Sequence, residues 1–104
     1  MFTFVESPLF TRLVDKYLSD DEYRKLQQAL VDNPEAGDVI AASGGVRKLR
    51  WAFMGRGKRG SLRVIYYVRT RAGVIWMLTL YPKNVADNIP AHVLRKIRQE
   101  MEGV

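Results

Sequence analysis

Residues 46–81, VRKLRWAFMGRGKRGSLRVIYYVRTRAGVIWMLTLY, contain three strand-like segments separated by two glycine-containing turns. Val46–Phe53 has the alternating pattern of a strand, and Leu62–Thr70 is rich in the β-branched and aromatic residues that favour strands. Val74–Tyr81 is almost continuously apolar, which is typical of an interior strand covered on both faces. Pro82 ends its pairing. The stretch predicts a three-stranded meander at the centre of the fold.

Helical patterns lie on both sides of this meander. Ser7 and Pro8 have the residue types that begin a helix, and Ser19 with Glu22 forms a capping-box pattern. The predicted elements outside the meander are a short strand at 2–4, a helix at 9–18, a helix from Ser19 to Asn33, a loop at 35–45 and a helix beginning near 88–90. This order predicts a single α+β domain over residues 1–104. Two N-terminal helices and one C-terminal helix would pack on one face of a small, antiparallel-rich sheet.

Composition excludes several classes of site. The 104 residues include no cysteine and one histidine, His92, so thiolate metal sites, disulfides and cysteine nucleophiles are absent. No histidine cluster or catalytic triad is visible, and we expect neither a metal nor a cofactor. The sequence shows no secretory signal and no apolar run of membrane-spanning length. We therefore expect a cytoplasmic protein.

Charge is distributed unevenly along the chain. The formal net charge is +6, but residues 1–45 contain 4 Lys or Arg and 8 Asp or Glu, whereas residues 46–104 contain 13 and 3. No carboxylate occurs between Asp38 and Asp87, a stretch with ten basic residues. A cationic surface without acidic residues repels itself, and an anionic partner such as RNA relieves that repulsion.

Several of these cations are predicted to converge on one face of the sheet. Lys48 and Arg50 point away from Leu49 and Trp51, which can enter the core. Because neighbouring strands lie about 4.8 Å apart, Arg63 and the residues around Tyr81 can come close to this pair. The remaining candidates are Lys83 after the last strand, Lys58 and Arg59 in the first turn, Arg47 and Tyr67. Cations interleaved with tyrosines suit RNA, which offers phosphates and unpaired bases.

Structural interpretations of the same residues stay open. Basic side chains on strands also line solvated faces or protect sheet edges, and the tyrosines also fit a core. Asp20, Asp21 and Glu22 are interpreted as partners of a helix dipole.

The segment GVRKLRWAFMGRGKRGSLRVIYYV, followed by WMLTLYPKN, resembles the RelE/HigB family of bacterial toxins, the HigB branch in particular. FVESPLF and YLSDDEYRKLQQALVDNPEAGDVI also resemble that branch, so the likeness covers nearly the whole chain. It implies a RelE-like fold and a metal-free endoribonuclease that enters the ribosomal A site and cuts messenger RNA. The ribose 2′-hydroxyl attacks the adjacent phosphate, which leaves a 2′,3′-cyclic phosphate and a 5′-hydroxyl.

The resemblance also implies partners and roles. A cognate antitoxin, which we expect to be of the helix-turn-helix type, inhibits such toxins, and operator DNA is bound only through the complex. Lys48, Arg50, Arg63 and Lys83 are the predicted catalytic residues. Arg47, Lys58, Arg59, Tyr67 and Tyr81 are predicted to bind RNA.

The general base is the point of departure from the family, because no carboxylate or histidine lies in the basic stretch. We hypothesise that Lys48 or Lys83 is the base, with Tyr81 as the alternative. The competing functional interpretations are a non-catalytic RNA- or DNA-binding module on the same fold and an inactive toxin that binds only its antitoxin.

Overall fold

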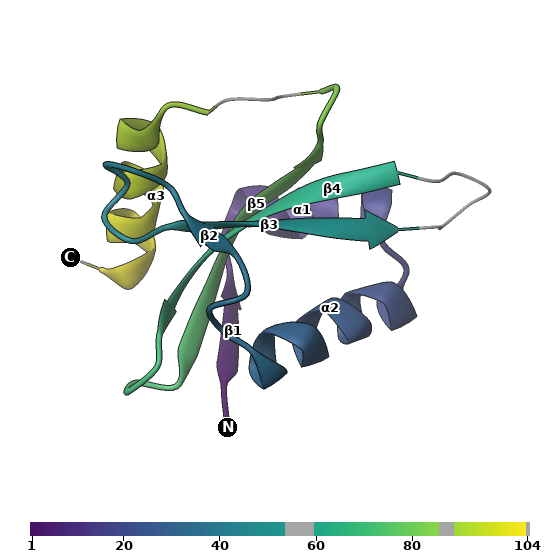
Figure 1. Cartoon of the computed structure of the whole chain (residues 1–104), viewed down its shortest axis with the longest axis horizontal. Coiled ribbons are helices and arrows are strands. Elements are labelled where there is room, and N and C mark those ends of the chain that lie inside the picture. Colours follow the sequence, from purple (N-terminus) through teal and green to yellow (C-terminus); the bar gives the residue numbers. More distant parts are fainter. Residues whose placement is uncertain (54–59, 86–88, 104) are drawn as a thin grey trace.

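The computed structural model describes residues 1–53, 60–85 and 89–103, which form a five-stranded sheet and three helices (Figure 1). The elements in chain order are β1 (Thr3–Glu6), α1 (Pro8–Tyr17), α2 (Asp20–Asp32), β2 (Asp38–Val39), β3 (Arg47–Phe53), β4 (Gly60–Arg69), β5 (Val74–Pro82) and α3 (Ala91–Glu102). In the part of the chain described, no helix is both long and apolar enough to cross a membrane.

The sheet has the strand order β1-β5-β4-β3-β2. β3, β4 and β5 form the predicted antiparallel meander, and β1 pairs with β5 in parallel. β5 is an interior strand whose residues 75–81 are all buried, as its apolar run predicts. β2 lies within residues 35–45, which were expected to form only a loop, and it pairs through two residues with β3.

The helices cover both faces of the sheet, so the expectation that all three pack on one face is wrong. Phe10 and Leu26, from α1 and α2, pack with Val64 and Met77 on one face. Leu94 of α3 packs with residues such as Ile65 and Trp76 of the other face. The physical reason is that β4 and β5 are apolar on both faces, and each face needs a cover. Figure 1 shows α2 and α3 on opposite sides of the strands.

The N-terminal ends of α1 and α2 confirm the predicted caps. The Ser7 hydroxyl accepts a hydrogen bond from the Phe10 N–H at 2.9 Å, and Pro8 occupies the first turn of α1. Ser19 and Glu22 form the reciprocal capping box of α2. α2 ends at Asp32, just before the predicted stop.

A β-bulge interrupts the pairing of β5 with β4. Ile65 pairs with Thr79 and Tyr66 with Met77, so Leu78 is an extra residue on β5. The Ser7 hydroxyl, besides capping α1, donates a 2.6 Å hydrogen bond to the Leu78 carbonyl. Ser7 therefore satisfies the backbone at the bulge and joins it to the start of α1.

The C-terminal end of α3 is held to the sheet by an ion-pair network. The Glu102 carboxylate accepts hydrogen bonds from Arg69 of β4 and from Arg98 of its own helix, and its side chain is almost completely buried. Burial tends to raise the pKa of Glu102, but the two guanidinium groups outweigh it and the pKa is lowered. The ionised form of Glu102 is thus the one that the fold stabilises.

Replacing Ser7 by alanine is expected to destabilise the protein by about 2–3 kcal/mol, because it removes both a helix cap and the buried hydrogen bond to the Leu78 carbonyl. Ser19→Ala is the matched control: it removes an exposed cap and is expected to cost about 1 kcal/mol. Urea unfolding of both variants measures the difference. Equal losses would contradict the bridging role of Ser7.

Stability should fall in acid partly through Glu102. Its pKa is lower in the folded than in the unfolded state, so its contribution is complete above its ordinary value of 4.5. That contribution is lost as the pH falls through the folded-state pKa. Glu102→Gln should therefore be less stable than the wild type at neutral pH, and the difference in stability should shrink as the pH falls below 4.5. The midpoints of urea unfolding of both proteins across this pH range measure the difference. A difference that does not change with pH would show that ionised Glu102 does not contribute to stability.

Candidate functional site

Three adjacent strands place Arg50, Arg63 and Tyr81 in register across the sheet. Arg50 of β3 pairs with Arg63 of β4, and Arg63 pairs with Tyr81 of β5. We call these three residues the arginine row. Lys48 stands two residues before Arg50, opposite Ile65. The expectation that Lys48 and Arg50 share a face with Arg63 is confirmed in the register.

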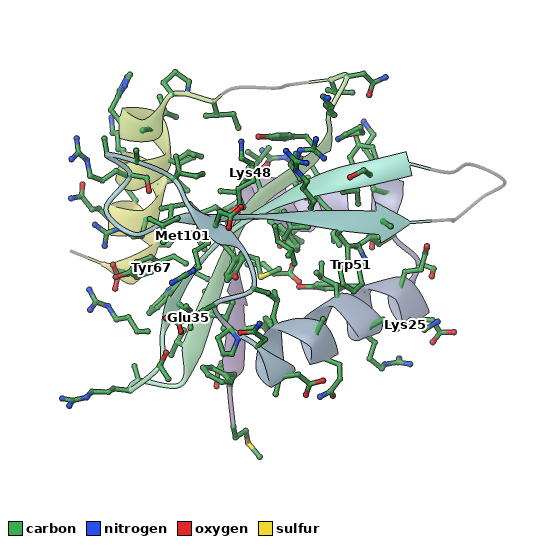
Figure 2. All side chains as sticks on the ribbon, viewed as in Figure 1. Lys25, Glu35, Lys48, Trp51, Tyr67 and Met101 are labelled. Atoms are coloured by element: carbon green, nitrogen blue, oxygen red, sulfur yellow. The ribbon has the colours of Figure 1, made fainter. Side chains whose placement is uncertain are left out.

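This face of the sheet is the one that α3 covers in part. Ile65 and Tyr81 pack with Leu94 of α3, while Leu49 and Trp51 of β3 contact the opposite core, as predicted. Figure 2 shows Trp51 on the α2 side of the sheet and Lys48 on the other side. Alternation along β3 thus separates the apolar residues that build the core from the cations that form the site.

Burial differs along the arginine row. Arg63 is only 6% exposed and Tyr81 is likewise buried, whereas Lys48 is half-buried and Arg50 is exposed. Arg63 Nη1 donates a 2.9 Å hydrogen bond to Ser61 Oγ. Within the residues that the structure describes, neither Arg50 nor Arg63 forms an ion pair with a carboxylate. The row therefore keeps two positive charges next to each other.

Such a pair of like charges is unfavourable in the absence of a ligand. Cations directly opposite each other on paired strands repel, and a buried guanidinium has lost part of its hydration. An anion placed between Arg50 and Arg63 relieves both effects, and the forked guanidinium suits the oxygens of a phosphate. Among the described residues, no group of three His, Asp or Glu side chains is arranged to bind a metal.

Lys83 lies close to this region in the sheet topology. It follows Pro82, the last residue of β5, which pairs with Leu62 next to Arg63. Lys83 is exposed in the turn that leaves the strand. Lys58 and Arg59, in the turn between β3 and β4, lie outside the described residues.

Tyr67 lies away from the arginine row. It pairs with Trp76, and the two rings are tilted with centroids 5.7 Å apart. The guanidinium of Arg98 lies over the Tyr67 ring at 4.8 Å. Figure 2 shows Tyr67 beside Met101 near the C-terminal end of α3. These contacts show that Tyr67 packs against α3, and we do not include it in the proposed site.

Arg47 is turned away from the site as well. Its guanidinium donates to the Gly37 carbonyl at 2.7 Å and forms an ion pair with Glu35 at 3.3 Å. The buried Tyr66 hydroxyl contacts the same segment, since it donates to the Pro34 carbonyl and accepts from the Gly37 N–H. Burial raises the pKa of Tyr66. These contacts hold the segment between α2 and β2, and we leave Arg47 out of the proposed site.

Ser61 is the residue at this site that sequence reasoning missed. A single serine in a strand carries no pattern of its own. Its position two residues before Arg63 places both side chains on one face, and that spacing is the signal that was present.

No protein-family model matches this sequence. In fold, the chain is similar to the E. coli toxin RelE, solved in the free state as a variant with two arginines replaced by alanine. The TM-score is 0.56, and the alignment covers 98% of this chain and 95% of that one. The chain has the RelE fold. Because sequence identity is 14%, the match to RelE establishes architecture, and it confirms the predicted α+β class with three helices around a small sheet.

Replacing Arg50 by glutamine should stabilise the free protein by about 0.5 kcal/mol at low ionic strength, because it removes the repulsion of Arg63. The gain should shrink in high salt, which screens exposed charges. Arg71→Gln, in the exposed turn between β4 and β5, is the control and should change little. Thermal unfolding at two salt concentrations measures both. A loss of stability in Arg50→Gln would show that the pair is not repulsive.

Proposed function

We propose that this protein is a RelE-family toxin of the HigB branch, a ribosome-dependent endoribonuclease that cleaves messenger RNA and so inhibits translation. The observation that carries the proposal is the arginine row, with Arg50 opposite Arg63 and Arg63 opposite Tyr81, together with Lys48 on the same face. The RelE fold and the resemblance of the sequence to this family support it independently.

The proposed reaction needs positive charge more than any other feature. The ribose 2′-oxygen forms a bond to phosphorus while the bond from phosphorus to the 5′-oxygen breaks, which gives a 2′,3′-cyclic phosphate and a 5′-hydroxyl. The non-bridging oxygens gain negative charge on the way to the transition state, and preorganised cations stabilise that charge. We assign this role to Arg63 and Arg50, which stand opposite each other on paired strands.

Two protons must also move. One leaves the 2′-hydroxyl and one reaches the departing 5′-oxygen. In our proposal Lys48 takes the first and Lys83 supplies the second, with Tyr81 as the alternative base. None of the ion pairs among the described residues joins a carboxylate to Arg50 or Arg63, and we assign proton transfer to the two lysines and Tyr81.

The remaining features of the proposal concern partners. Messenger RNA in the ribosomal A site is the proposed substrate, and Lys58 and Arg59 are proposed to bind RNA. The proposed inhibitor is a cognate antitoxin with a helix-turn-helix domain, through which the complex binds operator DNA. An acidic segment of that antitoxin would complement the basic stretch. The proposed location is the cytoplasm, where ribosomes are found.

Arg63→Ala should lower message cleavage at least 100-fold, the usual effect of removing one transition-state donor, and should abolish growth arrest when the gene is induced. Arg71→Ala is the matched control, because it removes an exposed arginine in the turn at the far end of β4. Message levels and growth after induction are the measurements.

The outcomes separate the candidate functions. If Arg63→Ala arrests growth as the wild type does, the catalytic assignment is wrong. If the wild type binds RNA but leaves messages intact, a non-catalytic RNA-binding module is the correct interpretation. An inactive toxin would do neither and would still bind its antitoxin.

A further inference from the structure

The strand that carries Arg63 also provides a partner for its side chain. Ser61 and Arg63 are two residues apart on β4, so both side chains stand on the face of the arginine row. Arg63 Nη1 donates to Ser61 Oγ at 2.9 Å. Across the sheet, Ser61 pairs with Ala52, whose methyl group offers no competing hydrogen-bond partner.

Arg63 needs such a tether for two reasons. An arginine side chain has many rotamers, and this freedom is lost when it binds a ligand in a single orientation. In addition, the charge of Arg50, directly opposite, pushes the guanidinium of Arg63 away from the site. A hydrogen bond on one nitrogen opposes this displacement and orders the group before a ligand arrives. The other N–H groups of the fork are then presented in a fixed direction.

The chemistry of the tether matters as much as its position. A carboxylate in place of Ser61 would hold Arg63 more strongly, but it would neutralise the charge and repel a phosphate. A hydroxyl orders the guanidinium and leaves its positive charge intact. The whole stretch between Asp38 and Asp87 likewise contains no carboxylate that could neutralise its basic residues.

We propose that Ser61 is the positioning residue of Arg63, holding its guanidinium ready for a phosphate oxygen of RNA. This inference rests on the proposed function, since it assumes that Arg63 binds the scissile phosphate. Ser61 acts through Arg63 and need not touch the substrate itself.

Three substitutions at position 61 test the chemistry of the tether. Ser61→Ala should lower message cleavage about tenfold, the value of one hydrogen bond to a charged group. Ser61→Thr keeps the hydroxyl in a residue that strands favour, and it should restore activity to within about twofold of the wild type. Ser61→Asp should be less active than Ser61→Ala although it holds Arg63 more tightly. A merely structural role would not produce this order, because Ser61 is exposed and packs in no core.

A double-mutant cycle tests whether Ser61 acts through Arg63. The readout is the affinity for a short fluorescein-labelled single-stranded RNA, which remains measurable when cleavage is lost. Ser61→Ala should weaken binding in the wild-type background and have no further effect in Arg63→Ala. Equal effects in both backgrounds would show that Ser61 does not position Arg63. Circular dichroism of each variant verifies that it is folded.

Failure of this inference is distinguishable from failure of the proposed function. Loss of cleavage in Arg63→Ala with full activity in Ser61→Ala overturns the positioning role alone. Full cleavage in Arg63→Ala overturns the proposed function and, with it, the reason for a tether.

Discussion

The rest of the structure depends on the pairing of β4 with β5, two strands that are apolar on both faces. A strand of this kind is stable only when both its faces are removed from water. α1 and α2 cover one face, and α3, anchored through Glu102, covers part of the other. The arginine row lies on the face that α3 covers, with Arg63 and Tyr81 buried and Arg50 exposed. The row therefore runs from the second core at Tyr81 to the protein surface at Arg50.

The arginine row places two positive charges next to each other at the edge of a packed core. Arg63 is nearly buried and Arg50 stands opposite it, an arrangement that costs stability in the free protein. The large apolar core on the opposite face offsets that cost. Strain of this kind is characteristic of functional sites, where groups are held ready for a partner that completes them.

Sequence reasoning succeeded where the signal was local. Alternation placed Leu49 and Trp51 in the core and Lys48 on the other face, and the capping box of Ser19 began α2 as expected. These features depend on residues within a few positions of one another, so a single segment contains all the information. The proximity of Arg50 and Arg63 could also be predicted, because residues on neighbouring strands of a sheet are only a short distance apart.

What sequence reasoning missed depends on contacts between distant segments. β2 has two residues and exists because β3 offers it an edge. The choice of sheet face by α3 depends on its packing against residues of distant strands, and no periodicity within the helix records that. Arg47 belongs to the same basic stretch as Lys48, yet Glu35 and Gly37 from an earlier segment fix its side chain elsewhere. Composition identified the basic stretch, but it did not distinguish residues with a structural role, such as Arg47, from residues of the candidate site.

The bulge at Leu78 has a further consequence for the geometry of the site. Before the bulge, Ile75 and Met77 face α1 and α2, and strict alternation would send Tyr81 to that side as well. The extra residue reverses the alternation, so that Leu80 enters the core and Tyr81 joins Arg63 on the opposite face. The carbonyl of that extra residue is held by the hydroxyl of Ser7. The N-cap residue of α1 therefore contacts the extra residue that sets the face on which Tyr81 lies, so the N-terminal segment contributes to the construction of the site.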